Sequence, residues 1–268
     1  DLGDGTVWVP SAEYGAVGRA NTDILQLNTA VETASDDLSV LQRGSTVYSV
    51  DETKGTVAQV NVADATVGDA ITLPAGTPHV FFAGDTAVIG NADTGELWAT
   101  PASDLAEFDA SAKADLTLGA DTVFDASDGH VAVYSAKTGT ASLVDVGTTL
   151  TVDQRWKVKM DRGDDFQVAT FDGHLAVLDR TSGALSVDGR TVELGDRVGS
   201  SPALQRSSDS TAQVTVAGVW FLLGHPLTLA AQVLVIVLSS VAMATQTVIG
   251  RRVEVASGVA TTFVTGTL

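Results

Sequence analysis

Apolar and polar residues alternate in short runs through most of the first two hundred residues of the chain. The runs are rich in Val, Thr and Ala and are bounded by Gly or Asp, which is typical of β-strands separated by turns. No stretch before residue 210 has the period of a long amphipathic helix, and residues 104–113 are the best candidate for a short one. In one complete unit we expect strands over 37–43, 45–51 and 56–62 and a shorter one over 70–73, and in the next unit over 79–83, 86–91 and 96–100.

A repeat underlies this alternation. Five segments share a Gly or Asp-Gly, an alternating strand and a turn that ends in a second Gly ten or eleven residues later. The first glycines are separated by steps of 39, 40, 45 and 44 residues and lie at Gly5, Gly44, Gly84, Gly129 and Gly173. A step near 40–45 residues is typical of four-stranded propeller blades. The repeat therefore predicts an all-β chain with a β-propeller of about five to six blades.

Two inner strands of this propeller are expected over 121–126 and 165–171. A sixth unit is expected to start at Gly199, with strands over 202–205 and 213–217. An incomplete ring stays open as an alternative, and so does a β-sandwich, which also has a strand every 8 to 12 residues.

Charge divides the chain into two parts. The net charge is −18, but no Asp, Glu, Lys or Arg occurs in the 41 residues between Asp209 and Arg251. Residues 1–209 carry about −19 and are expected to form the propeller repeats, whereas residues 210–268 carry only Arg251, Arg252 and Glu254. The acidity opposes nucleic-acid binding, and the lack of Cys excludes disulfide frameworks, thiolate metal sites and thiol nucleophiles.

The uncharged tail has three interpretations. Residues 227–249 have the length and composition of a membrane helix, which Pro226 could begin and Arg251 and Arg252 could hold on the cytoplasmic side. The polar residues within this segment and its many β-branched residues also suit buried strands, and a reading-frame slip or a truncated gene would explain the simultaneous loss of charge and repeat. The chain begins at Asp1, so we expect a mature form or a fragment, and export is inferred only indirectly.

Two histidines hold the same place in successive repeats. His130 follows Asp128-Gly129 and His174 follows Asp172-Gly173, so His130, His174, Asp128 and Asp172 are weak metal-site candidates. The other three repeats have Thr6, Ser45 and Asp85 at this place, which favours a structural role at the start of a strand. The sequence predicts no metal site and no cofactor.

The remaining candidate residues also have simpler interpretations. Solvated turns explain Asp125 with Asp128, and Asp161 with Asp164 and Asp165, better than a calcium loop does. The match Arg162-Gly163-Asp164 is expected by chance, and loops suit His79 and His225, which lie beside prolines. A blade core suits the four tryptophans, Trp8, Trp98, Trp156 and Trp220. No nucleophile elbow, phosphate loop or His-Glu-x-x-His motif occurs, so we assign no catalytic residue.

The repeat signature resembles those of quinoprotein-like bacterial propellers. Residues 4–15, Gly18-Arg19-Ala20-Asn21 and residues 37–42 are similar to a group of large actinobacterial exported proteins. In that group fibronectin type III or immunoglobulin-like modules follow the propeller and a membrane segment anchors the chain. Residues after Gly218 match neither blades nor such modules.

The resemblance implies an extracytoplasmic role at the cell envelope. We expect a non-enzymatic propeller that contacts a protein or cell-wall surface, as a monomer or within a longer multi-module chain. The alternatives are a propeller enzyme of the lyase, lactonase or glycosidase type with an axial acidic and histidine site, and a structural spacer.

Overall fold

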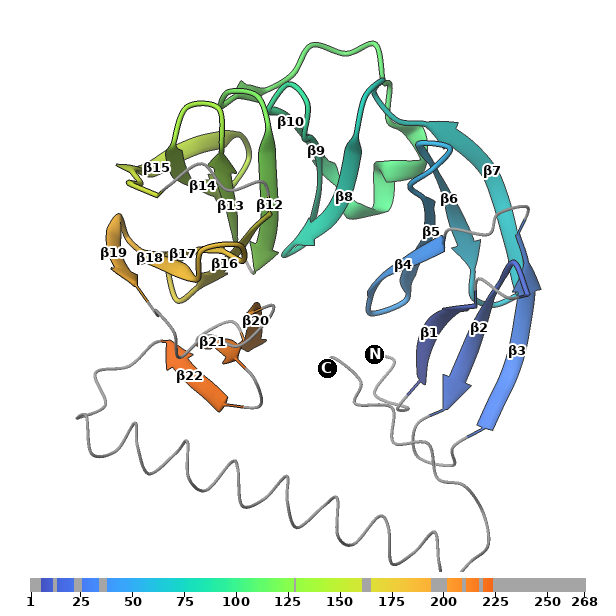
Figure 1. Ribbon diagram of the computed structural model, residues 1–268. Coiled ribbons are helices and arrows are strands. Elements are labelled where there is room, and N and C mark those ends of the chain that lie inside the picture. Colours follow the sequence, from blue (N-terminus) through green and yellow to red (C-terminus); the bar gives the residue numbers. More distant parts are fainter. Residues whose placement is uncertain are drawn as a thin grey trace, which may run out of the picture. The chain divides into compact units, whose positions relative to one another are not determined.

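The computed structural model describes residues 6–11, 14–21, 26–33, 38–127, 129–160, 165–193, 202–208, 211–216 and 219–223. Their regular secondary structure is β-strand, apart from one short 3-10 helix. The chain divides into two compact units, residues 1–157 and residues 158–268. Each unit is built from small antiparallel sheets whose strands follow one another in chain order (Figure 1).

The first unit holds one three-stranded sheet and three four-stranded sheets in its described part. The first described strands of these sheets, β1, β4, β8 and β12, contact one another in that order, as in successive propeller blades. The strands are β1 Thr6–Ser11, β2 Ala16–Asn21, β3 Gln26–Glu32; β4 Leu38–Arg43, β5 Thr46–Asp51, β6 Thr56–Asn61, β7 Thr66–Thr72; β8 Pro78–Ala83, β9 Thr86–Asn91, β10 Glu96–Pro101, β11 Leu116–Thr117; and β12 Thr122–Ser127, β13 His130–Ser135, β14 Thr140–Val146, β15 Leu150–Lys157.

The second unit repeats this design with a four-stranded sheet and a sheet of three described strands. Its first strands, β16 and β20, are again in contact. The strands are β16 Phe166–Phe171, β17 His174–Asp179, β18 Ala184–Val187, β19 Arg190–Glu193; and β20 Ala203–Ser208, β21 Thr211–Val216, β22 Val219–Leu223. The expected β-propeller blades are thus confirmed, as small separate sheets rather than the two large sheets of a sandwich.

The glycines of the repeat lie in the two hairpins of each four-stranded sheet. The first glycine joins the first strand to the second, and the second glycine joins the second strand to the third. At Gly95 glycine is required twice over, because its φ is +70° and an added Cβ would lie 1.5 Å from the carbonyl oxygen of Gly119. In the first sheet the repeat glycine precedes β1 itself, so by sequence β1 corresponds to the second strand of the other sheets.

A buried polar side chain supports the second hairpin of each four-stranded sheet. It ends the second strand, four residues before the second glycine, and accepts a hydrogen bond from a backbone N–H of the turn. The four acceptors are Asp51 (from Lys54 N, 2.8 Å), Asn91 (from Asp93 N, 3.1 Å), Ser135 (from Thr138 N, 3.3 Å) and Asp179 (from Thr181 N, 2.8 Å). Each buried acceptor is thereby satisfied by a donor of its own turn.

Apolar side chains on the facing sides of neighbouring sheets form the core. Strand β5 shows the alternation, since Val47 joins the cluster with Trp8 and Val17 of the first sheet, whereas Tyr48 and Val50 point to the sheet of β8–β11. Further clusters lie between β8–β11 and β12–β15, and between β16–β19 and Leu204 of β20. Both faces of a middle blade are therefore buried, which explains its two-sided apolar sequence.

The 45-residue step of the repeat contains an insertion after β10. Residues 104–113 were the best candidate for a short amphipathic helix, and this segment holds a 3-10 helix, η1, over Ala102–Glu107. Leu105 of this turn is fully buried, and the indole N–H of Trp98 donates to the carbonyl of Ala112 at 2.9 Å. Single buried anchors thus hold the insertion, where a helix would need a continuous apolar face.

Two further expectations differ in extent. The fourth strand of the complete unit covers Thr66–Thr72 instead of 70–73, because a bulge between Ala58 and Val60 lets the polar start of β7 pair with the end of β6. The sheet β20–β22 continues past residue 209 and includes Val219–Leu223, where we saw no repeat pattern. The described residues hold no helix long and apolar enough to cross a membrane, and the expected span 227–249 lies outside them.

Candidate functional site

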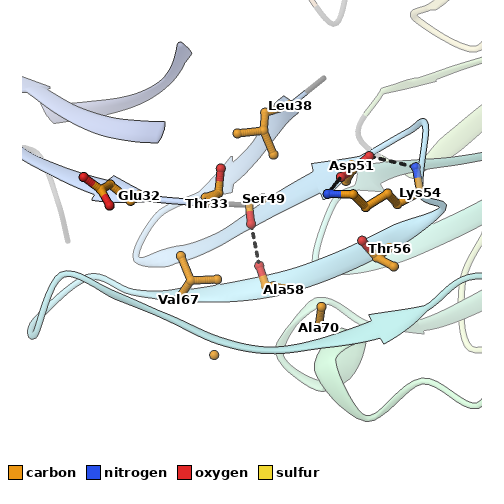
Figure 2. Close-up of a pocket in the computed structure, with 11 residues that line it drawn as sticks. Glu32, Thr33, Leu38, Ser49, Asp51, Lys54, Thr56, Ala58, Val67 and Ala70 are labelled. Atoms are coloured by element: carbon orange, nitrogen blue, oxygen red, sulfur yellow. Dashed lines mark hydrogen bonds and ion pairs between the residues drawn. The ribbon is translucent and has the colours of Figure 1, made fainter. Parts of the chain in front are cut away.

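A cavity of about 370 Å³ opens between β3 and the sheet of β4–β7. Figure 2 shows the side chains that line it. Eleven residues contribute to its wall: Glu32, Thr33, Leu38, Ser49, Asp51, Lys54, Thr56, Ala58, Val67, Gly68 and Ala70. All of them lie in the first unit, so one compact body forms the whole site.

The cavity follows from the alternation along β5. Val47, Ser49 and Asp51 share the face of β5 that points to the first sheet. Val47 packs there against Trp8, but the next two positions on this face are small or polar. On this face of β5 the apolar side chains therefore end at Val47, and the cavity lies beside the two positions that follow.

Most of the cavity wall is apolar, and its charges lie at the ends. Leu38, Ala58 and Val67 contribute carbon surface, while Figure 2 places Glu32 at one end and Lys54 at the other. The Glu32 residue is exposed, whereas the Asp51 side chain is only 7% exposed. An apolar group could occupy the middle with a polar group at either end.

Asp51 and Lys54 are bound to each other at two points. The Oδ1 atom of Asp51 accepts the backbone N–H of Lys54 at 2.8 Å, and its Oδ2 atom lies 3.2 Å from the Lys54 ammonium. The Lys54 side chain is 54% exposed, so its end stays accessible to solvent beside the cavity. The buried carboxylate is compensated within the fold, as a buried charge must be.

The hydroxyl groups near the cavity also take part in the fold. Ser49 Oγ donates to the carbonyl of Ala58 at 3.4 Å, and Thr33 Oγ1 donates to the carbonyl of Gly15 at 2.8 Å. With Glu32 and Asp51 against Lys54, the lining carries one excess negative charge. The site is thus suited to hold an apolar group that has a cation beside it.

The shifted pKa values found among the described residues lie elsewhere. Burial raises the pKa of the Tyr48 phenol, and its hydroxyl donates to the carbonyl of Ser103 at 3.3 Å. Hydrogen bonds from the hydroxyl and the N–H of Ser111 lower the pKa of Asp109. Neither residue lines the cavity: Tyr48 contacts the insertion after β10, and Asp109 lies within it.

The structure places the metal candidates at strand starts and in turns. His130 begins β13 and His174 begins β17, in different units, while Asp172 lies in a turn with φ +47° and Asp128 lies outside the described residues. His174 Nδ1 lies 2.7 Å from Asp188 Oδ2, so its described partner belongs to the β18–β19 turn and is not Asp172. In the described part of the chain, no group of three or more His, Cys, Asp or Glu residues is placed to hold a metal.

The other sequence candidates are dispersed. Asp165 pairs with Arg180 at 3.0 Å, Asp125 lies within β12, and His79 packs beside Phe124. Trp8 and Trp98 belong to the core as expected, while Trp156 is half-buried. The described residues do not include Asp161, Arg162-Gly163-Asp164 or His225. Trp220 lies in β22, but its side chain is not described.

Sequence reasoning missed the residues of the cavity. One signal for Asp51 was present, because Asp51, Asn91, Ser135 and Asp179 each stand four residues before the second glycine of a repeat. Glu32 had no such signal, since it enters the site only through the packing of one sheet on the next.

Solved structures with propeller-like folds are similar to this chain. Hsv2 of Kluyveromyces lactis is 12% identical, with a TM-score of 0.56 over 81% of this chain and 75% of its own. The dihydro-heme d1 dehydrogenase NirN is 15% identical, with a TM-score of 0.58 over 85% of this chain and 52% of its own. The chain has the fold of a β-propeller.

A third similar structure is a putative 6-phosphogluconolactonase from Bacteroides fragilis. It is 13% identical, with a TM-score of 0.52 over 84% of this chain and 80% of its own. No protein-family profile and no curated protein matches the sequence. At these identities the likeness shows the fold alone, and functions on one fold differ widely.

Proposed function

We propose that the chain is a non-enzymatic binding module that holds an extended segment of a protein partner in the cavity between β3 and β4–β7. The observation that carries the proposal is the apolar cavity wall with Glu32 and Lys54 at opposite ends. Such a cavity accepts one apolar side chain of a peptide, while the ends contact its polar neighbours.

The charges of the lining specify the partner further. Asp51 already forms an ion pair with the ammonium of Lys54, so we expect a cation of the partner to pair with Glu32. We expect a segment with an apolar residue next to Lys, Arg or a free amino terminus. The overall charge of −18 supports this choice, because it attracts a cationic segment from a distance.

The cellular setting belongs to the same proposal. We place the module outside the cytoplasm at the cell envelope, within a longer chain of the fibronectin-associated actinobacterial type. This placement is supported by the resemblance of residues 4–21 and 37–42 to that group and by the charge-free residues 210–250.

A peptide selection tests the binding function. A random heptapeptide library is selected on the purified protein, and the selected peptides are titrated against the wild type, Ala70→Leu and Ala112→Leu. Ala70 is exposed and lines the cavity, so leucine there fills it without changing the core, whereas Ala112 is exposed on the insertion.

We expect peptides with an apolar residue beside a cation, bound at least tenfold more weakly by Ala70→Leu and equally by Ala112→Leu. Peptides that both variants bind as well as the wild type would refute this site. Chemical turnover of a selected peptide would refute the non-enzymatic assignment.

A further inference from the structure

A second groove, of about 460 Å³, lies on the outer part of the sheet β12–β15. Its wall is formed by Leu118, Thr138, Thr140, Arg155, Trp156 and Lys157. It shares no residue with the cavity at β3–β7, although both belong to the first unit. Two of its six residues are cations and none is an acid, which is the opposite of the first cavity.

The strand register places the two cations on the same face of the sheet. Lys157 pairs with Thr140, and Arg155, two positions earlier on β15, pairs with Ser142. Residues two apart on a strand point to the same side, with Cα atoms roughly 6.5 Å apart. Both side chains can therefore reach one ligand group from a single face.

The ammonium of Lys157 is held in place by the neighbouring turn. Its Nζ atom donates to the carbonyl of Thr138 at 3.0 Å and to the hydroxyl of Thr140 at 2.9 Å. Both acceptors are neutral and no carboxylate is among them, so these contacts orient the positive charge without cancelling it. A lysine that is already oriented loses less side-chain entropy when it binds a ligand.

The local charge contrasts with that of the whole molecule. The chain has 33 acidic and only 15 basic side chains, yet a cation pair without an acid lines this groove. Asp153, on the same strand, is exposed and accepts a hydrogen bond from Gln154 at 3.2 Å, and it does not line the groove. A long polyanion would be repelled by the net charge, whereas a compact anion would mainly experience the nearby cations, since screening acts over roughly 8–10 Å.

From this arrangement we infer that the groove binds a compact anionic group, a phosphate or a carboxylate, between Arg155 and Lys157. The guanidinium of arginine binds such groups with two parallel hydrogen bonds, and the lysine adds a point charge. The group can belong to a free small molecule or to an acidic unit of an otherwise neutral polymer. This site does not depend on the peptide site proposed above.

Inorganic phosphate, glucuronate and glucose are titrated into the full chain at about 20 mM and 300 mM salt. Binding is measured by calorimetry or by amide NMR shifts. The tested variant is Arg155→Gln/Lys157→Gln. The control is Arg190→Gln, which removes an exposed cation that does not line the groove. Since all three side chains are exposed, thermal unfolding should hardly change in any variant.

We expect phosphate and glucuronate, but not glucose, to bind the wild type and Arg190→Gln. Added salt should lower these affinities several-fold. Each lost cation should cost about fivefold in affinity. A hyaluronan tetrasaccharide distinguishes the two sources of the anionic group. If its affinity per carboxylate exceeds that of glucuronate, the ligand is a polymer. If the two affinities are equal, the ligand is a free anion. No anion binding, or equal losses in the variant and the control, would overturn the inference.

Discussion

Asp51 contacts Lys54 at both ends of the lysine, because one carboxylate oxygen accepts the backbone N–H at 2.8 Å and the other lies 3.2 Å from the ammonium. The carboxylate is thereby part of the turn that closes the hairpin β5–β6 and also part of the cavity wall. The repeat that builds each blade thus also places charge in the candidate site.

Replacing Asp51 should separate its turn contact from its charge. Asp51→Ala leaves the N–H of Lys54 without its charged acceptor and should lower the free energy of unfolding by about 1–3 kcal/mol. Asp51→Asn should cost clearly less, because the amide oxygen can accept the same bond, as Asn91 does in the next blade. Urea denaturation of both variants measures the difference, and equal losses would show that the charge, not the turn contact, matters.

A second prediction concerns the hairpin glycines. Gly95→Ala should destabilise the protein by more than about 3 kcal/mol or prevent folding, since its Cβ would lie 1.5 Å from a backbone oxygen. Gly129→Ala is the matched control, because its φ of +78° is similar but nothing lies within 4 Å of the added Cβ. It should cost about 1 kcal/mol. Thermal melts of the pair test whether blade packing, beyond turn conformation, selects glycine at 95.

The blades could be predicted from sequence because their signals are local. Gly44 and Gly55 mark the two turns of one blade, and the residues between them alternate on a single strand. The start of β7 was missed because its polar residues do not alternate, and its pairing depends on a bulge opposite Ala58 and Val60. Such a bulge is fixed by the partner strand, which the local pattern does not contain.

The insertion after β10 should respond to alkaline pH through Tyr48. Burial raises the pKa of this phenol above its ordinary value of 10.0, so the folded state keeps the proton longer than the unfolded chain. The stabilising contribution is therefore complete below about pH 10 and is lost as the pH rises through the folded-state pKa. Between pH 9 and 11, the free energy of unfolding should fall less in Tyr48→Phe than in the wild type, by the linkage of about one proton. Urea denaturation at several pH values measures this difference. Identical pH profiles would contradict this account.

Leu105 should be the main anchor of the same insertion. Its side chain is fully buried in the cluster with Tyr48 and Trp98. Leu105→Ala should lower the free energy of unfolding by about 2–5 kcal/mol. The exposed Lys113→Ala, in the same insertion, should change it by less than about 0.5 kcal/mol. Similar effects of the two would mean that the insertion is not held by this contact.

The cavity could not be predicted from sequence for a different physical reason. Its lining combines Glu32 of β3, in one sheet, with Leu38 of β4 and Val67 of β7, in the next sheet. Only the packing of one sheet against the next brings them together. The histidines His130 and His174 drew attention because repeats align them, and each begins the second strand of its own sheet.

A reversal of charge at Glu32 tests the peptide-binding account most directly. Two peptides that differ only in Lys or Glu beside the same apolar residue are titrated against the wild type and Glu32→Lys, with Glu107→Lys as a control of equal charge change on the insertion. The account predicts that the wild type and the control prefer the lysine peptide, and that Glu32→Lys prefers the glutamate peptide. An unchanged preference in Glu32→Lys, or the same reversal in Glu107→Lys, would contradict it.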